Sequence, residues 1–360
     1  MPRHLAVMSL LGSRRTRLVL TVSALALPLA GCGGTDGSSG GMVTIPVTPT
    51  PSPSPTPSPT PSPSPSPSPT PTPPPTPTSW VAAAAALYDS PPNIDSCVTG
   101  ALKTTVRDDF LTRVNALRAL HNLAPVTYSA IENDQEDQSS LMQAANQTLS
   151  HTPPTTWKCY TSAGATAAGS SNLIGGWGTG LPWSTEDDNL AGWMTERYSD
   201  SIGHRRWILD PFLGKLTYGR VAQQATSGFR SDAASMKVFG FAADPPLPSS
   251  VPSFVAYPFG DYPSRYFGTG DILSFTAIVN STSRYANGSV SFANATVTVT
   301  GPSGNLAVTN VASDNLGYGV PNSIQWNVTG LQANVSYTVQ ITGVTGTPTS
   351  SYQYNFKIVP

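Results

Sequence analysis

A proline-rich segment at residues 46–78 sets the strongest limit on how this chain can fold. It holds 17 of the 36 prolines, and serine and threonine fill nearly all its other positions. Proline fixes φ near −65° and lacks a backbone N–H, so alternating prolines exclude both a helix and an internal strand. We expect an extended polyproline II spacer, about 100 Å long if straight. A proline-rich ligand for a recognition domain is the alternative.

The chain before this spacer has the pattern of an export signal. Three arginines within residues 14–17 precede an apolar stretch at 18–30, which is too short to span a bilayer. The stretch runs into Leu-Ala-Gly-Cys at 29–32, which resembles the lipobox of bacterial lipoproteins. The resemblance implies cleavage before Cys32 and lipidation of Cys32, which would anchor the chain at the bacterial cell envelope, facing outside the cytoplasm. An ordinary secretory signal with an incidental cysteine is the other interpretation.

Composition predicts two folded domains after the spacer. Only 11% of the residues are charged, and Lys+Arg 19 against Asp+Glu 20 leaves no basic excess, which excludes a nucleic-acid partner. The expected segments are a signal peptide at 1–31, a disordered Gly/Ser- then Pro/Ser/Thr-rich linker at 32–79, a mixed domain at 80–246 and an all-β domain at 250–360.

The first folded domain shows helical periodicity before it shows strands. Apolar spacing predicts helices over 105–122 and about 130–149, and a third helix that begins at Ser184. Two strands, 216–222 and 235–243, then bracket a Gly/Ser-rich turn. This order predicts an α+β fold.

Two cysteines, Cys97 and Cys159, remain after the export signal. In an oxidising compartment we expect them to form a disulfide, with roughly 3–5 kcal/mol of stabilisation from loop closure. Two free buried thiols are the alternative.

Several short segments occur in one order between residues 95 and 245. They are Val-Asn-Ala-Leu-Arg at 114–118, Leu-Ser-His at 149–151, Ser-Asn-Leu at 171–173, Trp-Met-Thr-Glu at 193–196, Gly-His-Arg-Arg at 203–206 and Ile-Leu-Asp-Pro at 208–211. In this order they resemble the CAP superfamily (cysteine-rich secretory, antigen 5 and pathogenesis-related proteins). The resemblance implies an α-β-α sandwich with a surface cleft that holds two histidines and two acids.

The residues of this expected cleft can be assigned by the resemblance. His151 and His204 match the two histidines, and Glu196 matches the acid carried by the third helix. Ser171 stands where the second acid is expected, so one carboxylate is missing. His151, Glu196 and His204 would still form a weak site for a divalent cation such as zinc. The alternative is that each histidine is a hydrogen-bonded structural residue.

The second folded domain has short alternating runs separated by turn signals, which predicts a β-sandwich. The setting of Tyr337 resembles the tyrosine corner of fibronectin III and immunoglobulin-like domains. Five aromatic residues between 257 and 267 either pack the two domains together or form a carbohydrate platform. The expected strands are 272–279, 295–300, 306–311, 323–328, 337–341 and 352–358.

The sequence favours binding over catalysis. The two folded domains, residues 80–360, contain neither a Gly-x-Ser-x-Gly nor a His-Glu-x-x-His motif. The leading interpretation is a surface-anchored binding module, attached to the membrane through Cys32, whose ligand is a lipid, a cell-wall component or a protein. The alternatives are a metal-assisted, peptidase-like hydrolase and a purely architectural envelope protein.

Of Arg205 and Arg206, one is expected to pair with an internal acid and the other to be solvated.

Overall fold

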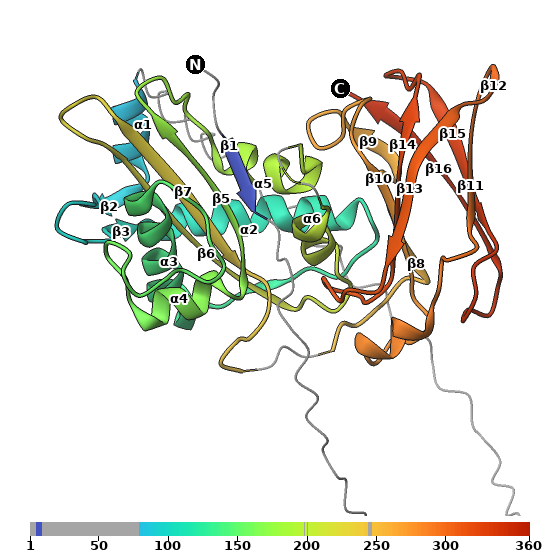
Figure 1. Cartoon of the computed structure of the whole chain (residues 1–360), viewed down its shortest axis with the longest axis horizontal. Coiled ribbons are helices and arrows are strands. Elements are labelled where there is room, and N and C mark those ends of the chain that lie inside the picture. The colour runs from blue at the N-terminus through green and yellow to red at the C-terminus, as the bar shows by residue number, and fades with distance from the viewer. Residues whose placement is uncertain (1–4, 9–78, 198, 200, 244–246) are drawn as a thin grey trace, which may run out of the picture. The chain divides into compact units, whose positions relative to one another are not determined.

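The computed structural model describes residues 5–8, 79–197, 199, 201–243 and 247–360, all of which belong to one compact unit. The predicted linker up to residue 78, Cys32, most of the signal peptide and the predicted domain end at residue 246 lie outside the described residues. Residues 79–243 are called the first region and residues 247–360 the second region (Figure 1). Within the described part, no helix has the length and apolar character needed to cross a membrane.

A five-stranded sheet forms the centre of the first region. Its three long strands are mutually antiparallel, and the short β4 joins the edge in parallel. The strand at residues 5–8, inside the predicted signal peptide, pairs with the other edge. In spatial order the strands are β1 (Leu5–Met8), β5 (Ser171–Gly178), β7 (Arg230–Lys237), β6 (Lys215–Gln224) and β4 (Thr127–Tyr128).

Helices cover both faces of this sheet, so the first region has three layers (Figure 1). One face packs against α3 (Asn133–Asn146) and α4 (Ser162–Ala168). The other face packs against α1 (Trp80–Ala86), α2 (Thr104–Ala119) and α5 (Glu186–Thr195), and α6 (Gly203–Ile208) follows α5 in the chain. The predicted α+β class is therefore confirmed.

The predicted elements are present with shifted ends. The second predicted helix is a short 3-10 turn, η1 (Ala130–Glu132), followed by α3, which ends at the left-handed Gln147. The predicted strand 235–243 was wrong by several residues, because a tight turn closed by Ala225 and Phe229 starts β7 at Arg230. The third helix begins at Glu186 rather than Ser184, since Thr185 and Asp188 form the capping box.

Two short pieces complete the first region. Trp80, the first residue of α1, is buried and packs edge-on against Trp183, with ring centroids 5.4 Å apart. After α1, β2 (Tyr88–Ser90) and β3 (Ala101–Leu102) pair and enclose a loop that carries Cys97.

The second region consists of two packed antiparallel sheets with one parallel edge, and Phe275 of one stacks on Tyr354 of the other. Trp326 is fully buried between them. The hydroxyl of Tyr337 accepts a hydrogen bond from the Gln332 N–H at 2.8 Å. The immunoglobulin-like class stays a prediction. The strands are β13 (Ala307–Asp314), β14 (Ser323–Thr329), β10 (Leu273–Ala277) and β8 (Phe254–Tyr257) in one sheet, and β12 (Gly304–Asn305), β11 (Thr296–Gly301), β15 (Ser336–Thr342), β16 (Ser351–Val359) and β9 (Gly260–Pro263) in the other, with η2 (Tyr285–Ser289) between β10 and β11.

Candidate functional site

Glu196 and His204 lie side by side between α5 and α6. Glu196 is the first residue after α5 rather than part of it, and its φ of 54° turns the chain back toward α6. Its Oε2 lies 2.8 Å from His204 Nδ1, and its Oε1 accepts a hydrogen bond from the Arg205 N–H at 3.0 Å. The exposed fractions of the His204 and Glu196 side chains are 2% and 0%. The pair is therefore sealed from solvent.

Ser171 does not join this pair. Its hydroxyl donates a hydrogen bond to Glu136 Oε2 of α3 at 2.9 Å, whereas its neighbour Asn172 donates to the His204 carbonyl at 3.0 Å. Successive residues of a strand face opposite sides of a sheet. Ser171 and the Glu196–His204 pair thus belong to opposite faces of β5.

His151 is nearly buried where the chain turns from α3 toward α4. Its Nδ1 lies 2.8 Å from the carbonyl oxygen of Ala168, the last residue of α4, and 8% of the residue is exposed. This ring nitrogen is therefore committed to fixing the end of α4.

The expected metal set is not assembled in the described part of the chain. No group of three or more His, Cys, Asp or Glu is placed there to hold one ion. Both oxygens of Glu196 already have partners within the protein: Oε2 lies against His204 Nδ1, and Oε1 accepts a hydrogen bond from the Arg205 N–H. Among the described residues, Glu196 and His204 therefore lie together, but His151 does not join them to form a three-ligand set.

A buried polar cluster beneath α3 was missed from the sequence. Glu136 is fully buried, and burial raises its pKa to about 8 although Lys237 opposes the rise. Lys237 is also buried, and its Nζ donates to Ser170 Oγ at 2.8 Å. Two features of the sequence could have indicated this cluster. Glu136 falls on the buried face of its helix, and Ser171 stands where the CAP resemblance leads one to expect an acid.

Neither arginine of the Gly-His-Arg-Arg segment is solvated, which corrects the prediction that one would be. Arg205 is fully buried, donates to the Met194 carbonyl at 3.0 Å and places its guanidinium carbon 3.9 Å from the ring centroid of Tyr257. Arg206 binds Asp314. Both side chains reach from the first region to the second, because their partners Tyr257 and Asp314 lie there.

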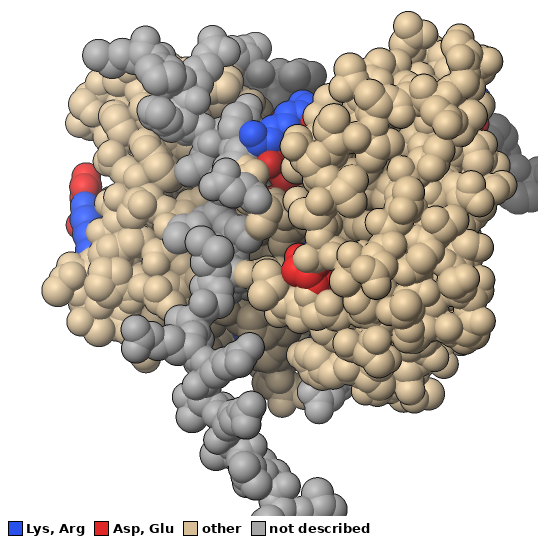
Figure 2. Space-filling view, turned by 45° about the vertical axis from the view of Figure 1, so that its right-hand side comes forward, with Lys and Arg blue, Asp and Glu red and all other residues tan. Residues whose placement is uncertain are grey.

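The junction of the two regions is completed by the third histidine. His121 Nδ1 lies 2.9 Å from the Ala256 carbonyl, and its Nε2 lies 3.0 Å from the Tyr262 hydroxyl. Burial lowers the pKa of His121 to about 3, so the ring is neutral. The prediction that aromatic residues at 257–267 pack the domains together is confirmed by the burial of Tyr257 and Tyr262. Few charged side chains appear on the face in Figure 2, and at some places on it positive and negative groups adjoin.

A groove with a volume of about 610 Å³ lies beside the Cys97–Cys159 disulfide, whose predicted pairing is confirmed. Trp157 and Tyr160 contribute to its lining, and both are half-buried. Asp134 of α3 lines it as well.

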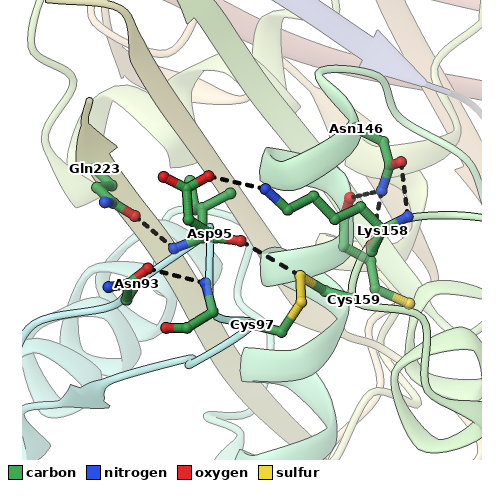
Figure 3. Close-up of a disulfide and its surroundings, with 10 residues drawn as sticks. Asn93, Asp95, Cys97, Asn146, Lys158, Cys159 and Gln223 are labelled. Carbon is green, nitrogen blue, oxygen red and sulfur yellow. Dashed lines mark hydrogen bonds and ion pairs between the residues drawn. A yellow bond between two sulfur atoms is a disulfide. The ribbon is translucent and has the colours of Figure 1, made fainter. Parts of the chain in front are cut away.

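Contacts around the disulfide hold one lip of the groove in place (Figure 3). Asn146, at the end of α3, accepts a hydrogen bond from the Lys158 N–H at 3.1 Å and donates one to the Lys158 carbonyl at 3.0 Å. The Lys158 ammonium lies 2.9 Å from Asp95 Oδ1. The segment between Trp157 and Cys159 is thus tied both to α3 and to the loop that carries Cys97.

Most of the first region matches a known protein family in sequence. Residues 111–229 match the model of CAP, the cysteine-rich secretory protein family. The match runs from α2 to the turn after β6, and we call these residues the CAP region. The CAP region contains the Glu196–His204 pair, His151, Ser171 and the Trp157 lip of the groove, but neither Cys97 nor the second region.

Other known proteins add little to the CAP match. An outer surface protein from Borrelia burgdorferi, compared as a solved structure, is 13% identical, and the comparison covers 38% of this chain and 95% of that chain with a TM-score of 0.25. A likeness at that score supports no inference. No curated protein matches the chain.

Proposed function

We propose that this protein is an extracytoplasmic CAP-domain binding protein, held at the cell envelope by a lipid on Cys32, rather than a hydrolase. The observation that carries the proposal is the sealing of Glu196 and His204 from solvent. A general base must come within hydrogen-bonding reach of the proton that it removes from a substrate. A carboxylate whose two oxygens face His204 and the Arg205 N–H, with no exposed surface, does not meet this condition.

The Glu196–His204 pair has a structural role, which explains why its polar atoms are buried and bound to each other and to the backbone. Glu196 joins the end of α5 to the first turn of α6, because it contacts His204 and the Arg205 backbone at once. That turn presents Arg205 and Arg206 to the second region. The Glu196–His204 pair therefore fixes the junction of the two regions.

A hydrolysis assay tests the catalytic part of this proposal. We expect no turnover of a peptide and ester panel, with or without added zinc, by wild type or by Glu196→Gln. Hydrolysis by wild type that Glu196→Gln abolishes would overturn the binding-only function.

The metal-assisted hydrolase is the second candidate, because His204 Nε2 is buried and has no hydrogen-bond partner among the described residues. Zinc titration separates it from the first. We expect wild type, His151→Ala and His204→Ala to show the same weak zinc binding. Loss of zinc affinity in both variants would favour the metal site.

The lipid anchor is tested separately from the ligand. Wild type should incorporate radiolabelled palmitate and fractionate with membranes, whereas Cys32→Ser should do neither. Membrane retention of an unlabelled Cys32→Ser chain would contradict anchoring through this residue.

A further inference from the structure

The groove beside the disulfide has the size and rigidity of a ligand site. Its volume of about 610 Å³ lies within the ~300–1,000 Å³ of pockets that hold small ligands. The Cys97–Cys159 bond joins its two lips, and Asn146 ties the second lip to α3 (Figure 3). A groove that is already formed loses little conformational freedom when it binds.

One wall of the groove carries a fixed row of polar groups. Gln138 Nε2 donates to Asp134 Oδ2 at 2.6 Å, and the Thr161 hydroxyl donates to Gln138 Oε1. Thr161 is held in turn because its oxygen caps α4 at the Gly164 N–H. This row leaves the second carboxylate oxygen of Asp134 and the second amide hydrogen of Gln138 without a partner among the described residues, available to a ligand.

The groove also offers aromatic surface. Trp157 and Tyr160 are half-buried, so each keeps part of its ring surface accessible. A sugar ring carries C–H groups on its faces and hydroxyl groups around its rim. Aromatic rings would contact the C–H face while Asp134 and Gln138 bind the hydroxyls.

The charge of the groove selects against anionic ligands. The ammonium of Lys158 is paired with Asp95, which leaves the Asp134 carboxylate as the charge that lines the groove. A phosphate headgroup would be repelled by this carboxylate. An acyl chain would place its methylene groups against the polar row of Asp134, Gln138 and Thr161, at the cost of their hydration.

We propose that this groove binds a neutral oligosaccharide chain, which rests on the proposed binding function and names its ligand class. Trp157 and Tyr160 provide the stacking surface, and Asp134 and Gln138 accept and donate the hydroxyl hydrogen bonds.

The test is calorimetric titration of the full chain, purified in detergent, with an N-acetylglucosamine hexamer, with maltohexaose and with an anionic hyaluronan hexamer. We expect at least one neutral hexamer to bind and the anionic one to bind more weakly. Trp157→Ala should raise the Kd about tenfold, and Trp157→Phe should restore most of the affinity. Tyr285→Ala removes an aromatic side chain that is 67% exposed outside the groove, and it should leave the Kd unchanged.

Asp134→Asn provides a second variant, because Asp134 is exposed and its exchange should not impair folding. It should weaken neutral-hexamer binding severalfold. Hexamer binding that Trp157→Ala and Asp134→Asn both leave unchanged overturns the assignment of the groove while the binding function stands. Binding of a proline decapeptide, with no binding of any hexamer, overturns the ligand class in favour of a peptide. Absence of all binding overturns the ligand class too, and the hydrolysis and zinc assays then decide the function independently.

Discussion

Arg206 donates two hydrogen bonds to Asp314, at 2.8 and 3.0 Å, across the junction of the first and second regions. The arginine is buried, whereas the Asp314 side chain is 34% exposed, so solvent screens part of the attraction. Arg206→Ala removes this pair and a bond to the Val320 carbonyl. We predict a loss of about 1.5–3 kcal/mol in the free energy of unfolding, measured by urea denaturation.

A matched control lies at the same junction. Arg265 binds Asp187 and Asp188, but its side chain is 44% exposed. Arg265→Ala should cost at most about 1 kcal/mol. Equal losses in the Arg206 and Arg265 variants would contradict the importance of burial at this contact.

Glu196→Ala should destabilise the protein by about 2–4 kcal/mol. The change leaves the buried His204 ring and the Arg205 N–H without their acceptor. Alanine and glutamate carry the same backbone cost at a φ of 54°, so the loss reports on the carboxylate. Thermal unfolding followed by circular dichroism measures it, and an unchanged midpoint would refute the structural role of the pair.

Glu136 gives the protein a specific pH dependence. Its pKa is about 8 when buried, against an ordinary 4.5, so the folded state holds a proton that the unfolded chain releases between these values. The free energy of unfolding therefore falls as the pH rises through this window. Glu136→Gln removes this contribution, and its stability relative to wild type should rise from pH 5 to 8 by at most about 1.4 kcal/mol per pH unit.

This comparison needs urea denaturation of both proteins at several pH values. The rise should level off above about pH 8, where Glu136 ionises in the folded protein as well. A difference that stays flat from pH 5 to 8, or that falls, would contradict the burial of a neutral carboxyl group under α3.

The disulfide should account for about 4 kcal/mol of stability. Cys97 and Cys159 are 62 residues apart in sequence, and closing a loop of that length restricts the unfolded chain. The double variant Cys97→Ala/Cys159→Ala should therefore unfold at lower urea than the wild type. Addition of a reductant should lower the midpoint of the wild type alone, and an equal effect on the double variant would show that the reductant acts elsewhere.

The local features of this fold could be read from the sequence, because they depend on neighbouring residues. Phe110, Val114 and Leu117 repeat at helical spacing, and all three are buried in α2 as expected. The pairing of Cys97 with Cys159 followed from the number of cysteines and the expected compartment. The turn after α5 did not follow, because it depends on the left-handed conformation of a glutamate, which few sequences signal.

The long-range polar contacts could not be read from the sequence. Arg206 and Asp314 are separated by 108 residues, and Ser171 and Glu136 by 35. The residues that surround Arg206 and Ser171 in the sequence do not indicate which distant side chain either one will contact. The groove likewise combines α3 with the segments around Cys97 and Trp157, which a linear pattern does not bring together.

The burial of Trp80 gives the first region a mechanical property. Tension applied to the chain just before residue 79 is transmitted to α1, whose first residue is this tryptophan. Its ring is held against Trp183 and lies 5.5 Å from the Arg230 guanidinium. A pull applied to the chain just before residue 79 would therefore have to extract this indole ring before it could peel α1 from the central sheet, so Trp80 is the mechanical attachment point of α1.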